Sequence, residues 1–311
     1  MKKILIFGGS GHIGRHLIGR LTKQNHLVTV VTRNLHKKGS ILKTQGNPGY
    51  LNIVEANIFD ENEIDNLIKN TDICINLVGI LFEKKNNTFK NIHTNFPTML
   101  SQKCEKYNIK KLIHVSALGI EKSLDSKYAK SKLEGEKNII NNFSNLSILR
   151  PSVIFSVDDN FTTNLMTLLN LLPIFPLYYS GKTKFCPLHV SDFCDIILKV
   201  IEENISDKII ECIGPEEISF REIIEKLLIS IDKKRILIPI PLKLANLIAY
   251  FFEKFPNPLI TRDQIRLLKY DNVLSGKYKS NFDIGVSAKV KFDNEILKYS
   301  YMWKKGGEYS K

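Results

Sequence analysis

The chain begins with an apolar segment of strand length that runs directly into three regularly spaced glycines. Residues 3–7 are Lys-Ile-Leu-Ile-Phe, and Gly8, Gly11 and Gly14 follow with two residues between each pair. A helical pattern starts within this motif. Such a junction presents backbone N–H groups and a helix N-terminus to a pyrophosphate. The motif therefore predicts a dinucleotide site, the alternative being a glycine-rich β–α turn without a ligand.

Each glycine has a distinct expected role. Gly8 allows the tight turn, Gly11 lets the backbone approach the phosphates, and Gly14 lets the helix pack closely on the strand. The loop and the first helical turn supply the first set of candidate cofactor-binding residues. These are Gly8, Ser10, Gly11, His12, Ile13, Gly14 and Arg15.

Apolar strands alternate with amphipathic helices over the first half of the chain. Strands are predicted at 3–7, 27–31, 51–56, 73–78, 111–115 and 146–149, helices at 12–24, 61–69, 91–107 and 128–142, and a loop at 34–50. This alternation is typical of β-α-β units and of a parallel sheet covered on both faces. The fold class predicted is α/β, with a Rossmann-type doubly wound sheet.

The regular alternation of predicted strands and helices ends after Arg150-Pro151. Helices are predicted at about 160–171, 191–204, 219–231, 241–255 and 261–270, separated by short strands and proline-rich turns. We predict a cofactor-binding domain over residues 1–155. A smaller, mostly helical domain over 156–311 is expected at the carboxyl edge of the sheet, where ligands bind. Interleaving of this second domain with the sheet is left open.

Composition limits the classes of partner. Five scattered cysteines without a Cys/His cluster give no expectation of a metal site and favour a reducing compartment. The net charge of +13 suits an anionic membrane surface or an acidic partner, or reflects compositional bias alone. The basic residues form no stripe interleaved with aromatics, so no nucleic-acid partner is expected.

No apolar run is long enough to span a bilayer, and the first strand lies where a signal peptide would. A cytoplasmic protein is therefore expected. The apolar, proline-broken segments 165–179 and 236–252 are candidates for contact with a membrane surface or a partner.

The end of the second predicted strand bears on the choice of dinucleotide. An acidic residue there binds the ribose 2′-OH of NAD, whereas an arginine receives the 2′-phosphate of NADP. The chain has Arg33 and no acid at this point, and Arg15 offers a second cation. NADP(H) is therefore favoured over NAD(H), with two solvated surface arginines as the alternative.

Two further strand ends supply candidate cofactor-binding residues. Asn57 and Ile58 follow the third strand, where the adenine edge lies in such folds, and Asn57 can bond an exocyclic amine. The fourth strand leads to Leu77, Val78 and Gly79. Gly79 would permit close approach of the cofactor. In the simpler interpretation Asn57 forms a turn and Gly79 only ends the strand.

Candidate catalytic residues follow the fifth strand. Tyr128 and Lys132 form a Y-x-x-x-K, which places both side chains on one helix face. The lysine is expected to lower the pKa of the tyrosine and to bind ribose hydroxyls, and the tyrosine to act as general acid or base. Ser116 could orient a substrate oxygen or simply satisfy backbone groups at the strand end.

In this order of motifs the chain resembles the extended or atypical short-chain dehydrogenase/reductases. Five features occur in the order typical of the family: the glycine motif, Asn95, Ser116, the Tyr/Lys pair and the segment 150–154. The resemblance implies that Pro151 and Val153 line the nicotinamide. In many members a Ser or Thr follows the strand-end serine, but here that residue is Ala117. This departure puts substrate turnover in doubt.

The resemblance is narrower still. Five sequence segments resemble those of the 39-kDa NADPH-binding accessory subunit group of respiratory complex I (alpha subcomplex subunit 9) and its bacterial relatives. They are 76–83, 114–119, 149–155, 259–264 and 271–273. This implies tightly bound NADPH and a structural or assembly role beside a membrane-associated complex. The expected location is then peripheral, on the inner face of the cytoplasmic membrane or the matrix side in a eukaryote. The alternative is an NADPH-dependent reductase, epimerase or dehydratase.

Overall fold

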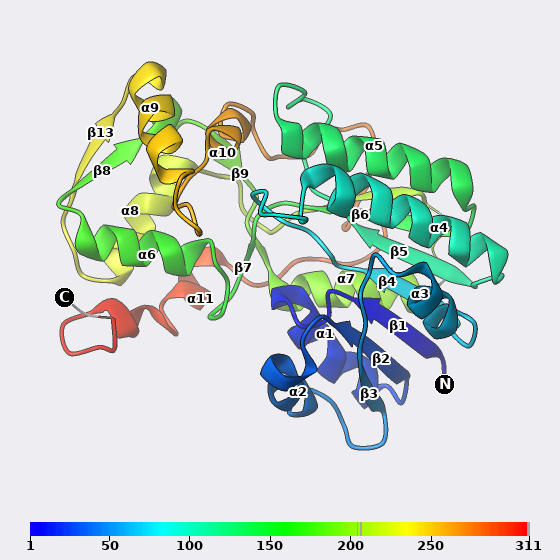
Figure 1. Ribbon diagram of the computed structural model, residues 1–311. Helices are drawn as coiled ribbons and strands as arrows, with labels where there is room; N and C mark the ends of the chain where they lie inside the picture. Colours follow the sequence, from blue (N-terminus) through cyan, green and yellow to red (C-terminus); the bar gives the residue numbers. More distant parts are fainter. Residues whose placement is uncertain (204, 206, 310–311) are drawn as a thin grey trace. The chain divides into compact units, whose positions relative to one another are not determined.

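A computed structural model describes residues 1–203, 205 and 207–309 (Figure 1). Its main sheet has eight strands among the described residues, and the predicted α/β class is confirmed. Across the sheet the order is β3 (Leu51–Glu55), β2 (Leu27–Thr32), β1 (Lys3–Phe7), β4 (Ile73–Asn76), β5 (Lys111–Val115), β6 (Leu146–Pro151), β11 (Ile209–Cys212) and β14 (Lys279–Ser280). The pairs from β3 to β6 are parallel.

The order of the strands fixes the place of a ligand. The chain moves outward from β1 to β3 on one side and from β4 to β6 on the other, so the strand order reverses between β1 and β4. In open parallel sheets ligands bind at this switch point, beyond the carboxyl ends of the strands. Phe7 and Asn76 are paired at that edge.

Helices cover both faces of this sheet (Figure 1). Their bounds are α1 (His12–Lys23), α2 (Leu35–Lys43), α3 (Glu61–Ile68), α4 (Phe96–Lys106), α5 (Lys127–Asn142) and α7 (Val190–Glu202). The neighbours α1 and α7 are joined by hydrogen bonds from Arg20 to Asp195 and from Gln24 to Glu202. On the other face Lys103 of α4 donates to Asp65 of α3 at 2.8 Å.

The hydrophobic core explains why these strands are central. All four residues of β4 and all five of β5 are buried. Leu5 and Phe7 of β1 pack in one cluster with Phe96 and Leu100 of α4 and with Ile139 of α5. A strand with both faces covered needs mostly apolar side chains on both, as in the Ile-Leu-Ile-Phe of β1.

The chain divides into two compact units. The first comprises Met1–Ala117, Ser131–Arg150 and Cys194–Ile210, and the second comprises Leu118–Lys130, Pro151–Phe193 and Glu211–Lys311. The chain thus passes between the units at several points. The predicted division at residue 155 stays a prediction.

The second unit is built from short elements. Its helices are α6 (Thr162–Leu171), α8 (Phe220–Ser230), α9 (Leu242–Phe252), α10 (Arg262–Leu267) and α11 (Phe292–Ile296), and its 3₁₀ turns are Tyr178–Gly181 and Ser300–Trp303. Two-stranded pairs join β7 (Ile154–Phe155) to β10 (Leu188–His189), β9 (Lys184–Phe185) to β12 (Ile218–Ser219), and β8 (Ile174–Leu177) to β13 (Ile236–Pro239). Aromatic residues, among them Phe155, Phe292 and Trp303, form its core.

Two predicted segments differ from the structure. The expected loop at 34–50 contains helix α2, which begins because the Asn34 side chain accepts a hydrogen bond from the N–H of Lys37. The expected single helix at 91–107 is divided into a π-helical segment, Lys90–Asn95, and α4. Pro97 at the first turn of α4 lacks an N–H, so regular helical bonding cannot continue through it.

Candidate functional site

The glycine loop joins β1 to α1 at the switch point of the sheet. Gly8 has φ +79°, and a Cβ there would lie 2.9 Å from the backbone carbon of Leu77. A Cβ on Gly14 would lie 2.4 Å from the backbone of Gly9, so the helix packs on the loop itself rather than on the strand. Both positions therefore require glycine. Gly11 is exposed, which leaves its backbone open to a ligand.

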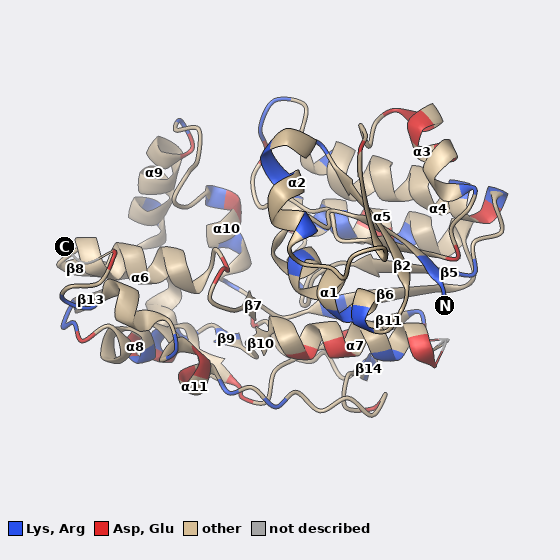
Figure 2. Ribbon diagram, turned by 90° about the horizontal axis from the view of Figure 1, so that it is seen from below, with Lys and Arg blue, Asp and Glu red and all other residues tan. Residues whose placement is uncertain are grey.

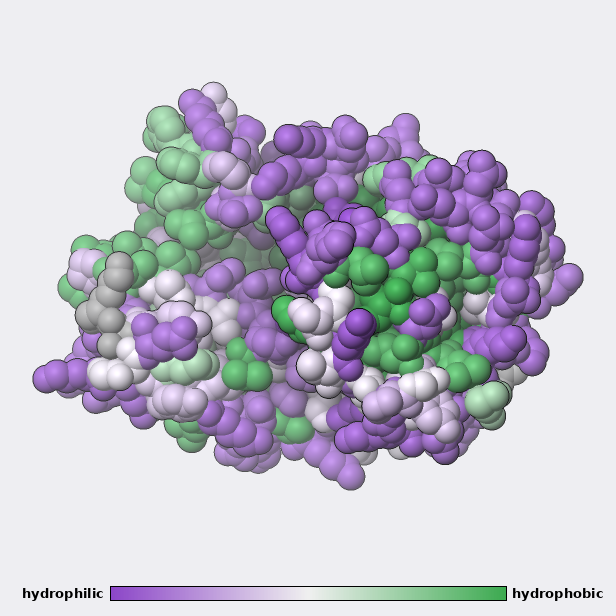
Figure 3. Space-filling view, turned by 60° about the horizontal axis from the view of Figure 1, so that its bottom comes forward, coloured by the Kyte–Doolittle hydropathy of each residue, from purple (hydrophilic) through white to green (hydrophobic). Residues whose placement is uncertain are grey.

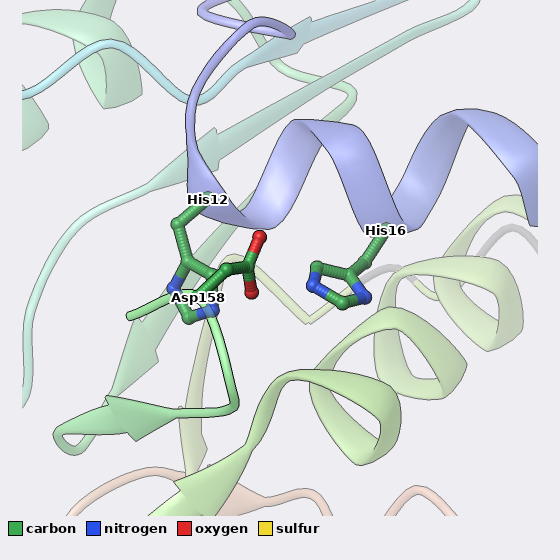
Figure 4. A group of neighbouring side chains, drawn as sticks. All are labelled: His12, His16 and Asp158. Carbon is green, nitrogen blue, oxygen red and sulfur yellow. The ribbon is translucent and has the colours of Figure 1, made fainter. Parts of the chain in front are cut away.

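The N-terminus of α1 is suited to an anion. Gly11 is the N-cap, and no side chain among the described residues caps this helix. The first turn of the helix itself holds no acidic residue, and a helix N-terminus of this kind favours an anion. His12 and His16 lie one turn apart on α1, with ring centroids 5.7 Å apart (Figure 4).

Buried hydrogen bonds of Asn76 order the turn that follows β4. Asn76 Oδ1 accepts a hydrogen bond from Val78 N at 3.0 Å, and its amide nitrogen donates to His114 Nδ1 at 3.1 Å. His114 belongs to β5, and burial lowers its pKa to about 3. The neutral imidazole thus accepts from Asn76, which holds the turn that leads to the exposed Gly79.

His93 fixes the other side of this turn. Its Nε2 accepts a hydrogen bond from Ile80 N at 3.1 Å, and its Nδ1 lies 3.0 Å from Ser131 Oγ on α5. Burial, and then the charge of Lys132, lower its pKa to about 2. The ring is therefore neutral with its proton on Nδ1, which donates to Ser131. This arrangement ties the loop after β4 to the helix that carries Lys132.

Lys132 and Ser116 lie in the first unit, each near the carboxyl end of β5. Lys132 Nζ donates to Val115 O at 3.3 Å, and a Cβ built on Gly79 would lie 3.9 Å from that nitrogen. Burial lowers the Lys132 pKa to about 8, partly opposed by Glu136. Ser116 Oγ is buried and has no hydrogen-bond partner among the described residues. An orphaned hydroxyl at this edge fits a polar ligand group.

Three candidate residues belong to the second unit. Tyr128 is half-buried on α5, one turn before Lys132, and its backbone N–H donates to Asp263 at 3.0 Å. Burial raises the pKa of Tyr128, opposite to the direction predicted from the neighbouring lysine. Pro151 is the last residue of β6, and Val153 follows it. Their contact with a nicotinamide stays a prediction.

The remaining candidates lie at strand ends of the first unit. Arg33 is exposed directly after β2. Asn57 is exposed, and its side-chain oxygen accepts from Phe59 N at 3.1 Å, which is the turn-forming role left open above. Ile58 is buried in the core of the sheet. Leu77 and Val78 are half-buried beside the glycine loop.

Sequence reasoning missed two residues of this region. His93 was hidden within the predicted helix, whereas Asn95, which carried the family resemblance, is exposed. Gly135 of α5 is the second, because a Cβ there would lie 1.9 Å from the carbonyl oxygen of His93. The close approach of α5 to the π-helical segment therefore depends on it. A π-helical turn near a functional edge is a known signal, but it becomes visible only in the structure.

Comparison with known proteins identifies the family of this chain. The profile of the NAD dependent epimerase/dehydratase family matches residues 4–212. The chain belongs to this family. It is thus a member of a dinucleotide-binding family, and the resemblance to the extended short-chain dehydrogenase/reductases is confirmed.

Two curated relatives match almost the whole chain. The NADH-ubiquinone oxidoreductase 40 kDa subunit of Neurospora crassa is 25% identical over 283 residues, 90% of this chain and 74% of the relative. The NADH dehydrogenase [ubiquinone] 1 alpha subcomplex subunit 9 of Mus musculus is 26% identical over 284 residues, 90% of this chain and 75% of the relative. The predicted similarity to this subunit group is confirmed.

A solved structure agrees with the fold. The UDP-glucuronic acid 4-epimerase of Bacillus cereus superposes with a TM-score of 0.73 at 17% identity, covering 96% of this chain and 98% of that one. In the described part of this chain, no helix combines the length and the apolarity needed to cross a membrane.

Proposed function

We propose that this protein binds NADP(H) at the switch point of its sheet and holds it as a structural cofactor within a membrane-associated respiratory complex. The dinucleotide would lie along the glycine loop, with its pyrophosphate at the N-terminus of α1. Arg33 and Arg15 would receive the 2′-phosphate, and Lys132 would donate to the nicotinamide ribose. When bound, the cofactor can supply a hydride; in this proposal it serves to stabilise the fold.

The uncapped N-terminus of α1 carries the binding part of the proposal. It combines with the orphaned hydroxyl of Ser116 and the open backbone at Gly79, both at the same sheet edge. The preference for NADP(H) is supported by the basic side chain directly after β2, where an NAD site carries an acid.

The structural role rests on two observations. Ala117 stands where many short-chain dehydrogenase/reductases carry a hydroxyl, so one candidate catalytic group beside Ser116 is missing. The relatives that match almost the full chain are named as subunits of NADH:ubiquinone oxidoreductases. A peripheral location at the inner face of a membrane, or the matrix side in a eukaryote, follows from such a partner.

Release of the cofactor by denaturation tests the proposal. Protein purified without added nucleotide is expected to release NADP(H) in near-stoichiometric amount, because the ligand of a structural site exchanges slowly. The measurement is chromatography and mass spectrometry of the supernatant. Release of NAD(H) would overturn the cofactor choice, and an empty or freely exchanging site would overturn the structural role.

An enzymatic alternative is favoured by one local feature. Tyr128 and Lys132 are four residues apart on α5 and so lie on the same side of that helix. In a reductase, epimerase or dehydratase the Tyr128 hydroxyl would give or take the proton at a substrate oxygen, and Ser116 would orient that oxygen. The pKa of Tyr128, raised by burial, keeps its phenol protonated near neutral pH.

Tyr128→Phe separates the two functions. Under the alternative, turnover of a sugar-nucleotide substrate is expected to fall by about 100-fold or more, since general acid–base catalysis contributes that much. Dinucleotide binding should be nearly unchanged, as measured by fluorescence titration. The control is Tyr301→Phe, an exposed tyrosine outside the site. Equal turnover in both variants would exclude Tyr128 as the acid or base.

A further inference from the structure

The second unit has an exposed apolar surface that its own core does not use. Helix α9 buries only two small residues, Ala245 and Ala249. Most of its large side chains are exposed, as is Phe255 after it, whereas Ile248 and Phe252 are half-buried. These large exposed residues, which we call the α9 surface, are Leu242, Leu244, Leu247, Tyr250, Phe251 and Phe255.

Helix α9 exposes more large apolar side chains than an ordinary surface helix does. Amphipathic helices bury their large apolar residues and expose polar ones. Here Leu247 is 53% exposed and Phe251 is 54% exposed, while Ala245 and Ala249 are buried and Ile248 and Phe252 are half-buried beside them. In water such a surface is costly, so it marks a site of contact with another apolar phase.

The apolar area continues beyond the helix. Among the described strands, β13 forms a two-stranded sheet with β8, and Ile236 on β13 is 62% exposed. Figure 3 shows one group of hydrophobic residues at the upper left of the view, over α9, and a second group right of centre. A contiguous patch of this kind distinguishes a docking surface from scattered exposed leucines.

The charges around the surface indicate its partner. Residues 232–263 contain six basic residues, Lys233, Lys234, Arg235, Lys243, Lys254 and Arg262, and three acidic residues, Asp232, Glu253 and Asp263. Glu253 is already paired with Arg262 at 2.8 Å. Lysines and arginines are spread over many elements (Figure 2), and residues 1–54 contain nine of them without an acidic residue. Lys243 on α9 and Lys254 just after it are exposed, and exposed lysines beside apolar side chains complement an anionic surface.

The aromatic residues of the α9 surface further limit the class of partner. Tyr250 and Phe251 lie against Lys254, whose Nζ is 4.9 Å and 5.4 Å from the two ring centroids. Aromatic rings with an apolar body, beside lysines that reach outward, are typical of the interface between acyl chains and headgroups. No helix in the described residues is long and apolar enough to span a membrane. Contact of α9 with a bilayer would therefore be at its surface.

We propose that the α9 surface docks on an anionic lipid bilayer, with α9 in the plane of the interface. Leu247 and Phe251 enter the acyl region, and Lys243 and Lys254 contact the headgroups. The inference deepens the proposed location at a membrane and does not depend on which dinucleotide is bound. A protein partner or a second copy of the chain is the competing occupant that the experiment below distinguishes.

Vesicle flotation of the full chain tests this. We expect the protein to float with vesicles of equimolar phosphatidylcholine and phosphatidylglycerol, and to float poorly with phosphatidylcholine alone or at high salt, because screening weakens the basic contacts. The double variant Leu247→Ser/Phe251→Ser is expected to reduce partitioning by at least about tenfold, because two large apolar side chains are removed from the interface.

The matched control is Leu297→Ser/Phe59→Ser, two exposed apolar residues outside the α9 surface. It should float like the parent chain, and thermal melts should show that both variants are folded. Failure of the parent chain to bind anionic vesicles, or equal binding by the α9 variant, would overturn the proposal. Loss of self-association in the α9 variant without vesicle binding would assign the surface to a second copy. Release of dinucleotide is a separate measurement, so the two proposals can fail independently.

Discussion

Replacing Glu136 by alanine is expected to lower the free energy of unfolding by about 3–5 kcal/mol, because it leaves a buried arginine without its counter-charge. Glu136 of α5 and Arg150 of β6 form a bidentate pair, with Nε–Oε1 at 3.0 Å and Nη2–Oε2 at 2.5 Å. Their side chains are only 1% and 3% exposed. Urea denaturation at neutral pH measures the effect.

Two further variants make this prediction specific. Glu134→Gln changes an exposed carboxylate two residues away on the same helix and should alter stability by less than about 0.5 kcal/mol. The double variant Glu136→Met/Arg150→Met removes both charges and should recover most of the loss, since the cost arises from an unpaired buried ion. If Glu136→Ala and Glu134→Gln had equal effects, the pair would not be a main support of the α5–β6 contact.

The central strands could be predicted because burial on both faces makes most of their residues apolar. The strand Lys111–Val115 was predicted with the bounds that the structure has. Helix α2 was missed because its start depends on a side-chain cap by Asn34 rather than on an apolar stripe. A short helix with two buried residues, Gly39 and Leu42, gives little periodicity to detect.

For the candidate site, the backbone requirements were predictable and the side-chain contacts were not. The glycine spacing indicated the turn at Gly8, which has positive φ. The roles of His93 and His114 depend on which groups meet across strands and helices far apart in the sequence. Nothing in the local pattern distinguishes a histidine that will be buried and neutral from one that is exposed.

These two histidines give the second large effect, a loss of stability in acid. Their folded pKa values, about 2 for His93 and about 3 for His114, lie far below the ordinary value of 6.5. The unfolded chain therefore binds protons that the folded chain does not. Stability is fully present above the unfolded pKa and is lost as the pH falls from there toward the folded values. Between pH 8 and 5 the expected loss is about 2 kcal/mol for each histidine.

His114→Asn tests this assignment. Asparagine can still accept a hydrogen bond from Asn76 but has no proton to bind, so the variant should lose about half of the histidine-dependent fall in unfolding free energy, roughly 2 kcal/mol. His36→Asn, at an exposed position, should keep the full dependence. The measurement is the free energy of unfolding from urea titrations at several pH values. A His114→Asn slope equal to that of the parent chain would mean that this ring is protonated in the folded state, and the hydrogen bond that it accepts from Asn76 would then be excluded.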